Sequence, residues 1–273
     1  MNKIFKKFVR KTSGLSLSNK ISTSLSDNQI YPQVCLDAAN DYRFFNQFRQ
    51  NPIYNQILEH VTEKEGAAYL EIIAHDLVLL GEMEKFRKND LHGTPRVYQY
   101  PNVGSVSPST LRYVKVLSDL KNLFKSLDGL SICEIGVGYG GQCRIINAQY
   151  VPKAYRLVDI KPALLLAQRF LDNYAVKSTL SYMTMNELEK NNYDLVISNY
   201  AFTELPRHIQ EIYLEKVILN SRRGYIIYND INPLEFKSYK KEELLKVIPG
   251  SRIIDEVPLT HPNNCVILWD TNG

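Results

Sequence analysis

The sequence has few cysteines, little net charge and no long hydrophobic run. Its four cysteines lie far apart and none belongs to a C-x-x-C pair, which argues against a zinc site or a disulfide framework and is typical of a reducing cytoplasm. The net charge of +4 is too small to indicate nucleic-acid binding. No apolar stretch is long enough for a signal peptide or a membrane-spanning helix. We therefore expect a cytoplasmic protein that acts without nucleic acid.

The chain is large enough to bury a sizeable core, with 273 residues of which 44% are hydrophobic. Residues 1–11 carry five basic side chains interleaved with apolar ones. As a helix this segment could touch an anionic membrane surface, and as a frayed terminus it would be solvated. A serine-rich stretch, 12–27, has the composition of a linker. We predict a basic start and flexible linker over residues 1–34.

Residues 35–130 have helical periodicity and are predicted to form a helical N-terminal region. Three residue pairs have the form of helix starts: Asn51 with Pro52, Thr62 with Glu65, and Ser107 with Pro108. Apolar residues recur in steps of three and four over 64–87, which predicts one long helix. His75 falls in its apolar stripe and is expected in the core. An aromatic loop is expected over 92–110.

Residues 131–273 show short apolar runs separated by helical segments, the pattern of a parallel sheet with helical crossovers. This predicts an α/β fold with a doubly wound, seven-stranded sheet. Strands are expected at 131–135, 155–160, 178–183, 193–199, 224–230, 252–259 and 265–269, with helices near 140–150, after Pro162, after Pro206 and near 240–248. Only five residues separate the last two strands, so the last strand must be antiparallel.

A glycine-rich turn follows the first of these strands. Gly136, Gly138 and Gly141 complete a G-x-G-x-x-G pattern between a strand and a helix. Asp159 ends the next strand, where ribose hydroxyls need an acceptor, and taken alone this fits NAD. Glu134 precedes the first glycine by two positions. Its carboxylate would repel a pyrophosphate and attract a ligand that is cationic at sulfur and amine.

The segment CEIGVGYGG, together with the antiparallel end of the sheet, resembles the class I S-adenosylmethionine-dependent methyltransferases, whose motif reads acidic-x-Gly-x-Gly-x-Gly. This resemblance implies S-adenosylmethionine as cofactor, with Glu134 and Gly136 along its methionyl part and Asp159 on its ribose. Glycines let the backbone approach such a ligand closely. Arg112 could pair with the cofactor carboxylate through its planar fork. The full set of expected cofactor residues is Glu134, Gly136, Gly138, Gly140, Asp159, Thr184, Asn199 and Arg112.

The stretch DLVISNYAFTELP, 194–206, places Asn199 and Glu204 at the carboxyl end of the fourth strand, where ligands bind in open α/β sheets. It resembles the sugar O-methyltransferase family, although Ala201 stands where a serine is common. The upstream segments GTPRVY and SPSTLRY look like the acceptor-side region of that family, which implies that residues 35–130 lie on the acceptor side. The resemblance implies that a sugar hydroxyl accepts the methyl group, in surface-glycan biosynthesis. Glu204 and three tyrosines, whose rings offer flat amphipathic surfaces, are expected at the substrate: Tyr98, Tyr100 and Tyr113.

A sugar hydroxyl must lose its proton as the methyl group moves, which requires a base or a metal ion. His261 follows the sixth strand and is the first choice of base, with Asp230 to orient it. Asp230 and Asn232 could instead bind magnesium through their oxygens. His208, in the first turn of a helix, is the competing base.

Two other functions stay open from the sequence. One is an NAD-dependent oxidoreductase. Submillimolar binding of NAD, with no binding of S-adenosylmethionine, would favour this function. The other is a non-catalytic binding or scaffold protein that keeps the cofactor fold. This function would be favoured if His261, His208 and Asp230 all lay far from the cofactor sulfur.

Overall fold

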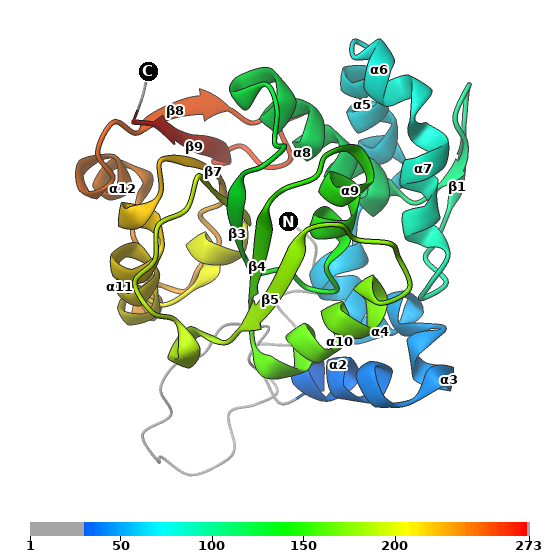
Figure 1. The fold of residues 1–273 in the computed structure, drawn as a ribbon, viewed down its shortest axis with the longest axis horizontal. Helices are drawn as coiled ribbons and strands as arrows, with labels where there is room; N and C mark the ends of the chain where they lie inside the picture. The colour runs from blue at the N-terminus through cyan, green and yellow to red at the C-terminus, as the bar shows by residue number, and fades with distance from the viewer. Residues whose placement is uncertain (1–29, 272–273) are drawn as a thin grey trace.

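The computed structural model describes residues 30–271, so the basic segment 1–11 and the serine-rich stretch 12–27 lie outside the described residues. Its centre is a seven-stranded sheet with the order β5-β4-β3-β6-β7-β9-β8 (Figure 1). Neighbouring strands run parallel from β5 to β7, whereas β9 is antiparallel to both β7 and β8. The predicted antiparallel last strand is therefore confirmed.

All seven predicted strands are present. They are β3 (Ser131–Ile135), β4 (Ala154–Val158), β5 (Thr179–Met183), β6 (Leu195–Asn199), β7 (Arg223–Tyr228), β8 (Arg252–Asp255) and β9 (Cys265–Asp270). Only β8 ends much earlier than expected. Past Asp255, Pro258 has no N–H to donate to a ladder, and the Glu256 carboxylate accepts a hydrogen bond from the Thr260 backbone instead.

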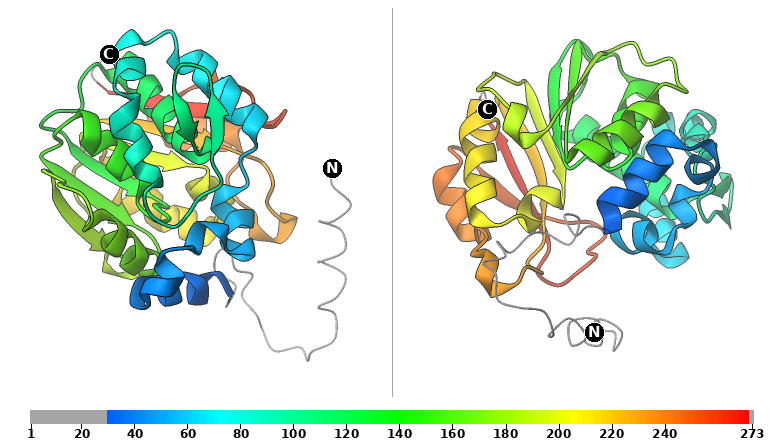
Figure 2. Two further views of the ribbon diagram at one scale, coloured as in Figure 1. Left: turned by 90° about the vertical axis from the view of Figure 1, so that its right-hand side faces the viewer. Right: turned by 90° about the horizontal axis from the view of Figure 1, so that it is seen from below.

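Helices cover both faces of the sheet, which confirms the doubly wound fold (Figure 2). One face packs against α8 (Pro108–Phe124), α9 (Gly141–Gln149) and α10 (Lys161–Leu171), and the other against α11 (Arg207–Lys216) and α12 (Lys241–Val247). Short 3-10 turns complete the connections: η5 (Met185–Glu187), η6 (Ala201–Glu204), η7 (Ile218–Asn220) and η8 (Leu234–Phe236). The four predicted crossover helices are thus confirmed.

The N-terminal region is helical, as predicted, but begins earlier and is more broken. Its elements are α2 (Ile30–Asn40), α3 (Tyr42–Phe45), η2 (Phe48–Gln50), α4 (Pro52–Tyr54), the π-helix η3 (Asn55–Glu59), α5 (Glu63–Ile73), α6 (Leu77–Gly81), α7 (Met83–Arg87) and η4 (Lys88–Asp90). Residues 30–34, assigned to the linker, belong to α2. The expected loop also contains a small antiparallel sheet, β1 (Tyr98–Tyr100) and β2 (Gly104–Val106).

The single long helix predicted over 64–87 is wrong. Asp76 interrupts it, because its side chain accepts hydrogen bonds from the N–H groups of Val78 and Leu79, both at 3.1 Å, and so starts a new helix. His75 is exposed at this break rather than buried in the core. The three predicted helix starts are confirmed, since the side chains of Asn51, Thr62 and Ser107 each accept a backbone N–H.

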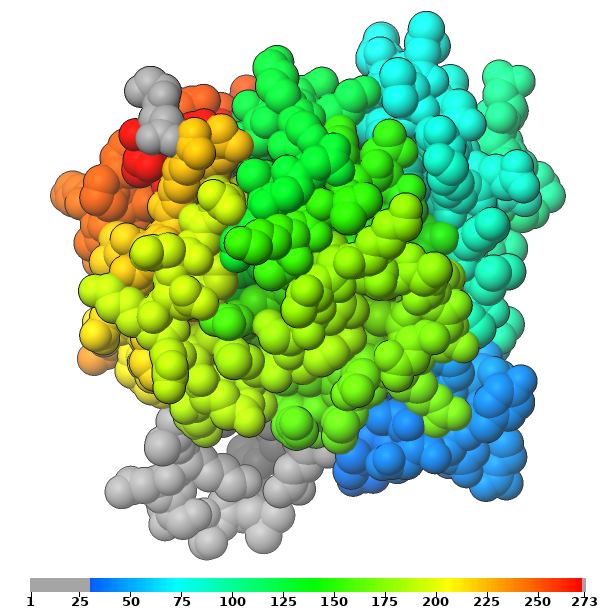
Figure 3. Space-filling model, in the orientation of Figure 1, coloured from blue at the N-terminus to red at the C-terminus, as the bar shows by residue number. Residues whose placement is uncertain are grey.

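The helical region and the sheet share one hydrophobic core. Helix α2 packs along α10, and Figure 3 shows these two segments in contact at the lower right of the molecule. Arg49, with 1% of its surface exposed, fixes the region internally by pairing with Glu59 at 2.8 Å and Asp90 at 3.0 Å. No helix within residues 30–271 is long and apolar enough to cross a membrane.

Candidate functional site

The glycine turn links β3 to α9 and requires glycine at several positions. Gly136, Gly138 and Gly140 have φ angles of 80°, 53° and 84°, which side chains with a β-carbon rarely adopt. A β-carbon at Gly136 would also lie only 2.0 Å from that of Ala201. The predicted turn is therefore present, with the η6 segment lying directly on it.

Asp159 lies beside this turn, immediately after β4. Its Oδ2 atom accepts a hydrogen bond from the Gly138 N–H at 2.9 Å. The carboxylate thus occupies the position at the end of the second strand where a ribose acceptor was predicted. Thr184, at the end of β5, is already engaged, because its hydroxyl donates to Glu187 at 2.7 Å in a capping box.

Glu134 was expected to place a charged carboxylate along the ligand, but its surroundings do not favour the charged form. It is only 2% exposed, and the Tyr155 hydroxyl donates to it at 2.6 Å. Burial, with a smaller contribution from the nearby Asp159 charge, raises its pKa from a usual value near 4.5 to about 8. The carboxyl group is therefore mostly protonated at neutral pH.

Among the buried polar atoms without a hydrogen-bond partner in the described residues, two belong to predicted cofactor residues. One is Oδ1 of Asn199 at the end of β6, whose amide nitrogen donates to Gln142 at 3.3 Å. The other is Nε of Arg112 on α8, a side chain that is 8% exposed. Buried polar atoms without partners are rare, and a ligand or an ordered water is their usual complement.

Arg112 lies beside the π-helix η3, where its Nη2 donates to the carbonyl of Leu58 at 3.1 Å. The Leu58 side chain itself covers the glycine turn, since a β-carbon at Gly138 would lie 2.8 Å from its Cδ1. A π-helical turn, a form that is frequent at functional sites, therefore stands between Arg112 and the predicted cofactor-binding turn.

Tyr200 follows β6 with a φ of 70°, a strained conformation for a residue other than glycine. Its hydroxyl donates to the Glu256 carboxylate, which also accepts a 2.7 Å hydrogen bond from the Thr260 hydroxyl. This network joins the end of β6 to the loop after β8. The turn at Tyr200 directs the chain into η6 and so places Ala201 against Gly136.

Glu204 ends η6 at the carboxyl edge of the sheet. Asn229, which follows β7, donates a 2.6 Å hydrogen bond to its Oε1. Burial raises the pKa of Glu204, an effect that the Asn229 hydrogen bond and the nearby Arg112 charge only partly oppose. The site thus contains a partly buried carboxyl group whose basicity exceeds that of an ordinary glutamate.

The three catalytic residues predicted from the sequence do not come together. His261 is exposed, and its Nδ1 accepts the Asn263 N–H at 3.4 Å within its own turn. Asp230, expected to orient it, instead pairs with Lys240 at 2.6 Å. His208 is exposed in the first turn of α11. Within residues 30–271 no hydrogen bond or ion pair links His261 to Asp230.

The magnesium alternative also lacks a ligand set. Asn232 directs its amide nitrogen to the Thr203 carbonyl and to the Ser238 hydroxyl. No group of three or more histidine, cysteine, aspartate or glutamate side chains in the described part of the chain could hold a metal ion.

The three tyrosines expected at the sugar are placed differently from one another. Tyr100 and Tyr113 are only 5% and 6% exposed, and the Tyr100 hydroxyl donates to the Glu63 carbonyl at 3.1 Å. Their ring faces are therefore covered by protein. Tyr98 is half-buried and lines a hollow of about 110 Å³ beside His60.

Comparisons with known proteins find similarity in fold. No protein-family model matches the chain, and a search of curated proteins finds no match. The chain is similar to magnesium protoporphyrin IX methyltransferase from Synechocystis PCC 6803, with 19% identity, a TM-score of 0.45, and coverage of 57% of this chain and 76% of that one. It is also similar to the pyocyanin biosynthetic protein PhzM, with 16% identity, a TM-score of 0.44, and coverage of 59% and 56%. A methyltransferase from Aquifex aeolicus shows 17% identity, a TM-score of 0.39, and coverage of 57% and 87%.

Proposed function

We propose that this protein transfers a methyl group from S-adenosylmethionine to a hydroxyl group of a sugar, in glycan biosynthesis. The observation that supports this most is the Asp159 carboxylate held at 2.9 Å against the N–H of a glycine turn that follows an acidic residue. In an open α/β sheet this edge is the ligand-binding crevice.

The residues present fit the cofactor. Asp159 would accept hydrogen bonds from the ribose hydroxyls. The two partnerless atoms, Arg112 Nε and Asn199 Oδ1, suit the carboxylate and the ammonium of its methionyl end. When bound, the cofactor supplies an electrophilic methyl group on a cationic sulfur. Leu58, which now covers Gly138, would have to give way to a ligand on the turn.

Glu204 is the proton acceptor that the geometry supports best. It lies on η6, the segment that contacts the glycine turn, and Asn229 fixes the position of one carboxylate oxygen. Its raised pKa makes it a stronger base toward a sugar hydroxyl than an exposed glutamate. His261 remains the second candidate base.

Methyl-transfer assays test this proposal. The full chain would be incubated with S-adenosylmethionine labelled in its methyl group and with neutral oligosaccharides, and the labelled position would be located by mass spectrometry. We expect label on a sugar oxygen. Glu204→Gln should reduce transfer by about 10²-fold or more, whereas His261→Ala should leave it near wild type. Strong loss in His261→Ala alone would assign the base to His261, and label on nitrogen or carbon would reject the sugar hydroxyl.

A further inference from the structure

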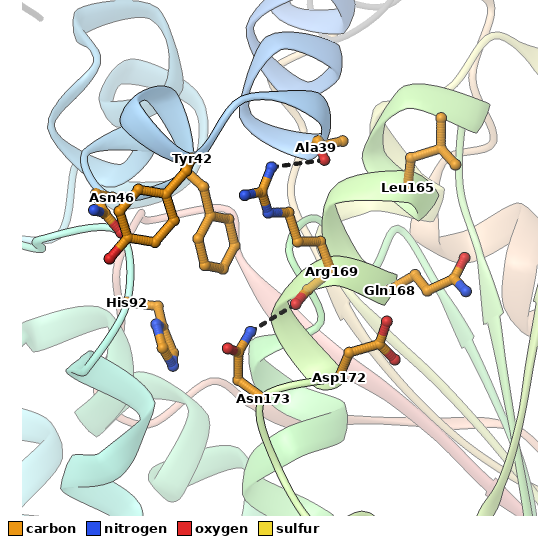
Figure 4. Close-up of a pocket in the computed structure, with 10 residues that line it drawn as sticks. Ala39, Tyr42, Asn46, His92, Leu165, Gln168, Arg169, Asp172 and Asn173 are labelled. Carbon is orange, nitrogen blue, oxygen red and sulfur yellow. Dashed lines mark hydrogen bonds between the residues drawn. The ribbon is translucent and has the colours of Figure 1, made fainter.

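A surface hollow of about 620 Å³ lies between α3 and the outer side of α10 (Figure 4). Tyr42, Asn46 and His92 stand on one side of it, and Gln168, Asp172 and Asn173 stand on the other. None of these six residues belongs to the glycine turn or to the predicted acceptor site. The hollow is therefore formed by other residues than those that carry the function proposed above.

Aromatic rings form one wall of the hollow. The Tyr42 residue is 67% exposed, so its ring face is open to a ligand. His92, on the same side of the hollow, packs against Phe45, with ring centroids 5.5 Å apart, and against Phe170 at 6.2 Å. The exposed ring of Tyr42 offers a flat, amphipathic surface on this side of the hollow.

Planar polar groups stand on both sides of the hollow. The side chains of Asn46, Gln168 and Asp172 make no hydrogen bond to any other residue between 30 and 271, so their donors and acceptors are available. Amides both donate and accept hydrogen bonds, and a carboxylate can accept two at once. Such groups beside an exposed ring match a ligand that has an apolar face and a rim of hydroxyl groups.

The charges around the hollow favour a neutral ligand. Arg169 is already engaged, because its Nη1 donates to the carbonyls of Ala38 and Ala39 at 3.1 and 2.8 Å, at the C-terminal end of α2. Its guanidinium also lies 4.7 Å from the centre of the Phe45 ring. Burial lowers the pKa of His92, which disfavours the charged form of its ring. Arg169 is the only lysine or arginine among the described lining residues, and the Asp172 carboxylate lines the same hollow, so the two opposite charges balance.

We propose that this hollow binds a neutral sugar unit, with the ring of Tyr42 against the apolar face of the pyranose and the side chains of Gln168 and Asp172 bonded to its hydroxyls. It is separate from the predicted cofactor turn, because α10 lies between them: Phe170 contacts Tyr139 of that turn at 4.8 Å. Together with the proposed function, on which this last step rests, the hollow would hold a part of the acceptor glycan away from the methylated unit.

The test uses the full chain and a panel of neutral gluco-, galacto- and manno-oligosaccharides, titrated while amide chemical shifts are recorded. We expect saturable shifts at Tyr42, His92 and Gln168. Tyr42→Ala and Gln168→Ala should each raise the dissociation constant about tenfold. Phe44→Ala is the matched control, because Phe44 is also an exposed aromatic of α3, at 47%, but does not line the hollow; it should leave the affinity unchanged.

Three results would overturn the sugar site: no shift at the hollow with any member of the panel, shifts confined to another surface, or equal weakening by Phe44→Ala. The affinity for S-adenosylmethionine, measured on the same samples, separates this proposal from the proposed function. Sugar binding at the hollow without cofactor binding would reject the methyltransferase and keep the sugar site. Cofactor binding with an unresponsive hollow would do the reverse.

Discussion

Replacing Glu134 by Gln should remove a large part of the pH dependence of stability. In the folded chain, burial holds the pKa of this carboxyl group at about 8, compared with a usual value near 4.5 when it is exposed. Because the folded-state pKa is the higher one, the associated stability is complete below about pH 4.5 and is lost as the pH rises through about 8. A difference of this size corresponds to at most about 5 kcal/mol, and relaxation around the ionised group would reduce it.

Urea unfolding at pH 5, 7 and 9 measures this effect. The free energy of unfolding of the wild type should fall relative to that of Glu134→Gln as the pH rises, by several kcal/mol across the range. The amide oxygen of Gln can still accept a hydrogen bond from the Tyr155 hydroxyl, so the variant can replace the 2.6 Å hydrogen bond of the wild type. Glu211→Gln is the control, because Glu211 is exposed. A constant difference between wild type and Glu134→Gln at all three pH values would refute the assigned ionisation.

Other substitutions give further expected outcomes. In the same urea assay, Gly136→Ala should lower the free energy of unfolding by about 2 kcal/mol or more, because of the positive φ and the 2.0 Å contact with the Ala201 β-carbon. Gly81→Ala, at an open helical position, is the control and should not destabilise the protein. Arg112→Lys should weaken S-adenosylmethionine binding about tenfold by calorimetry through loss of the planar fork, while Arg96→Lys should not. Glu204→Gln should reduce kcat and leave KM unchanged, because the carboxylate accepts the proton only in the transition state of methyl transfer.

Much of the sheet could be predicted from the sequence, because buried parallel strands read as short apolar runs and five residues between the last two strands permit only an antiparallel pair. The break after α5 was missed for the opposite reason. Apolar spacing continues across Asp76, and only its side-chain hydrogen bonds to the next turn reveal that the helix stops there.

The site was predicted only in part, since side-chain direction at a strand end depends on contacts between strands. The position of Asp159 beside the turn follows from chain topology and was found. The burial of Glu134 follows from Tyr155 on the neighbouring strand, and pairing between strands cannot be read from local pattern. Likewise Asn229, which holds Glu204, is adjacent to the predicted Asp230 but was not recognised. Its position directly after β7, on the edge of the sheet where Glu204 also lies, could have indicated a contact between the two residues.

Calorimetric titration of the full chain with S-adenosylmethionine tests the central claim most directly. We expect one molecule to bind per chain, with affinity about tenfold weaker in Asp159→Asn, because a charge-assisted hydrogen bond to the ribose would be lost. Asp255→Asn, at an exposed position that ends another strand on the same edge, should bind as the wild type does. Tight binding of NAD with no heat from S-adenosylmethionine, or equal affinity in Asp159→Asn, would contradict the account.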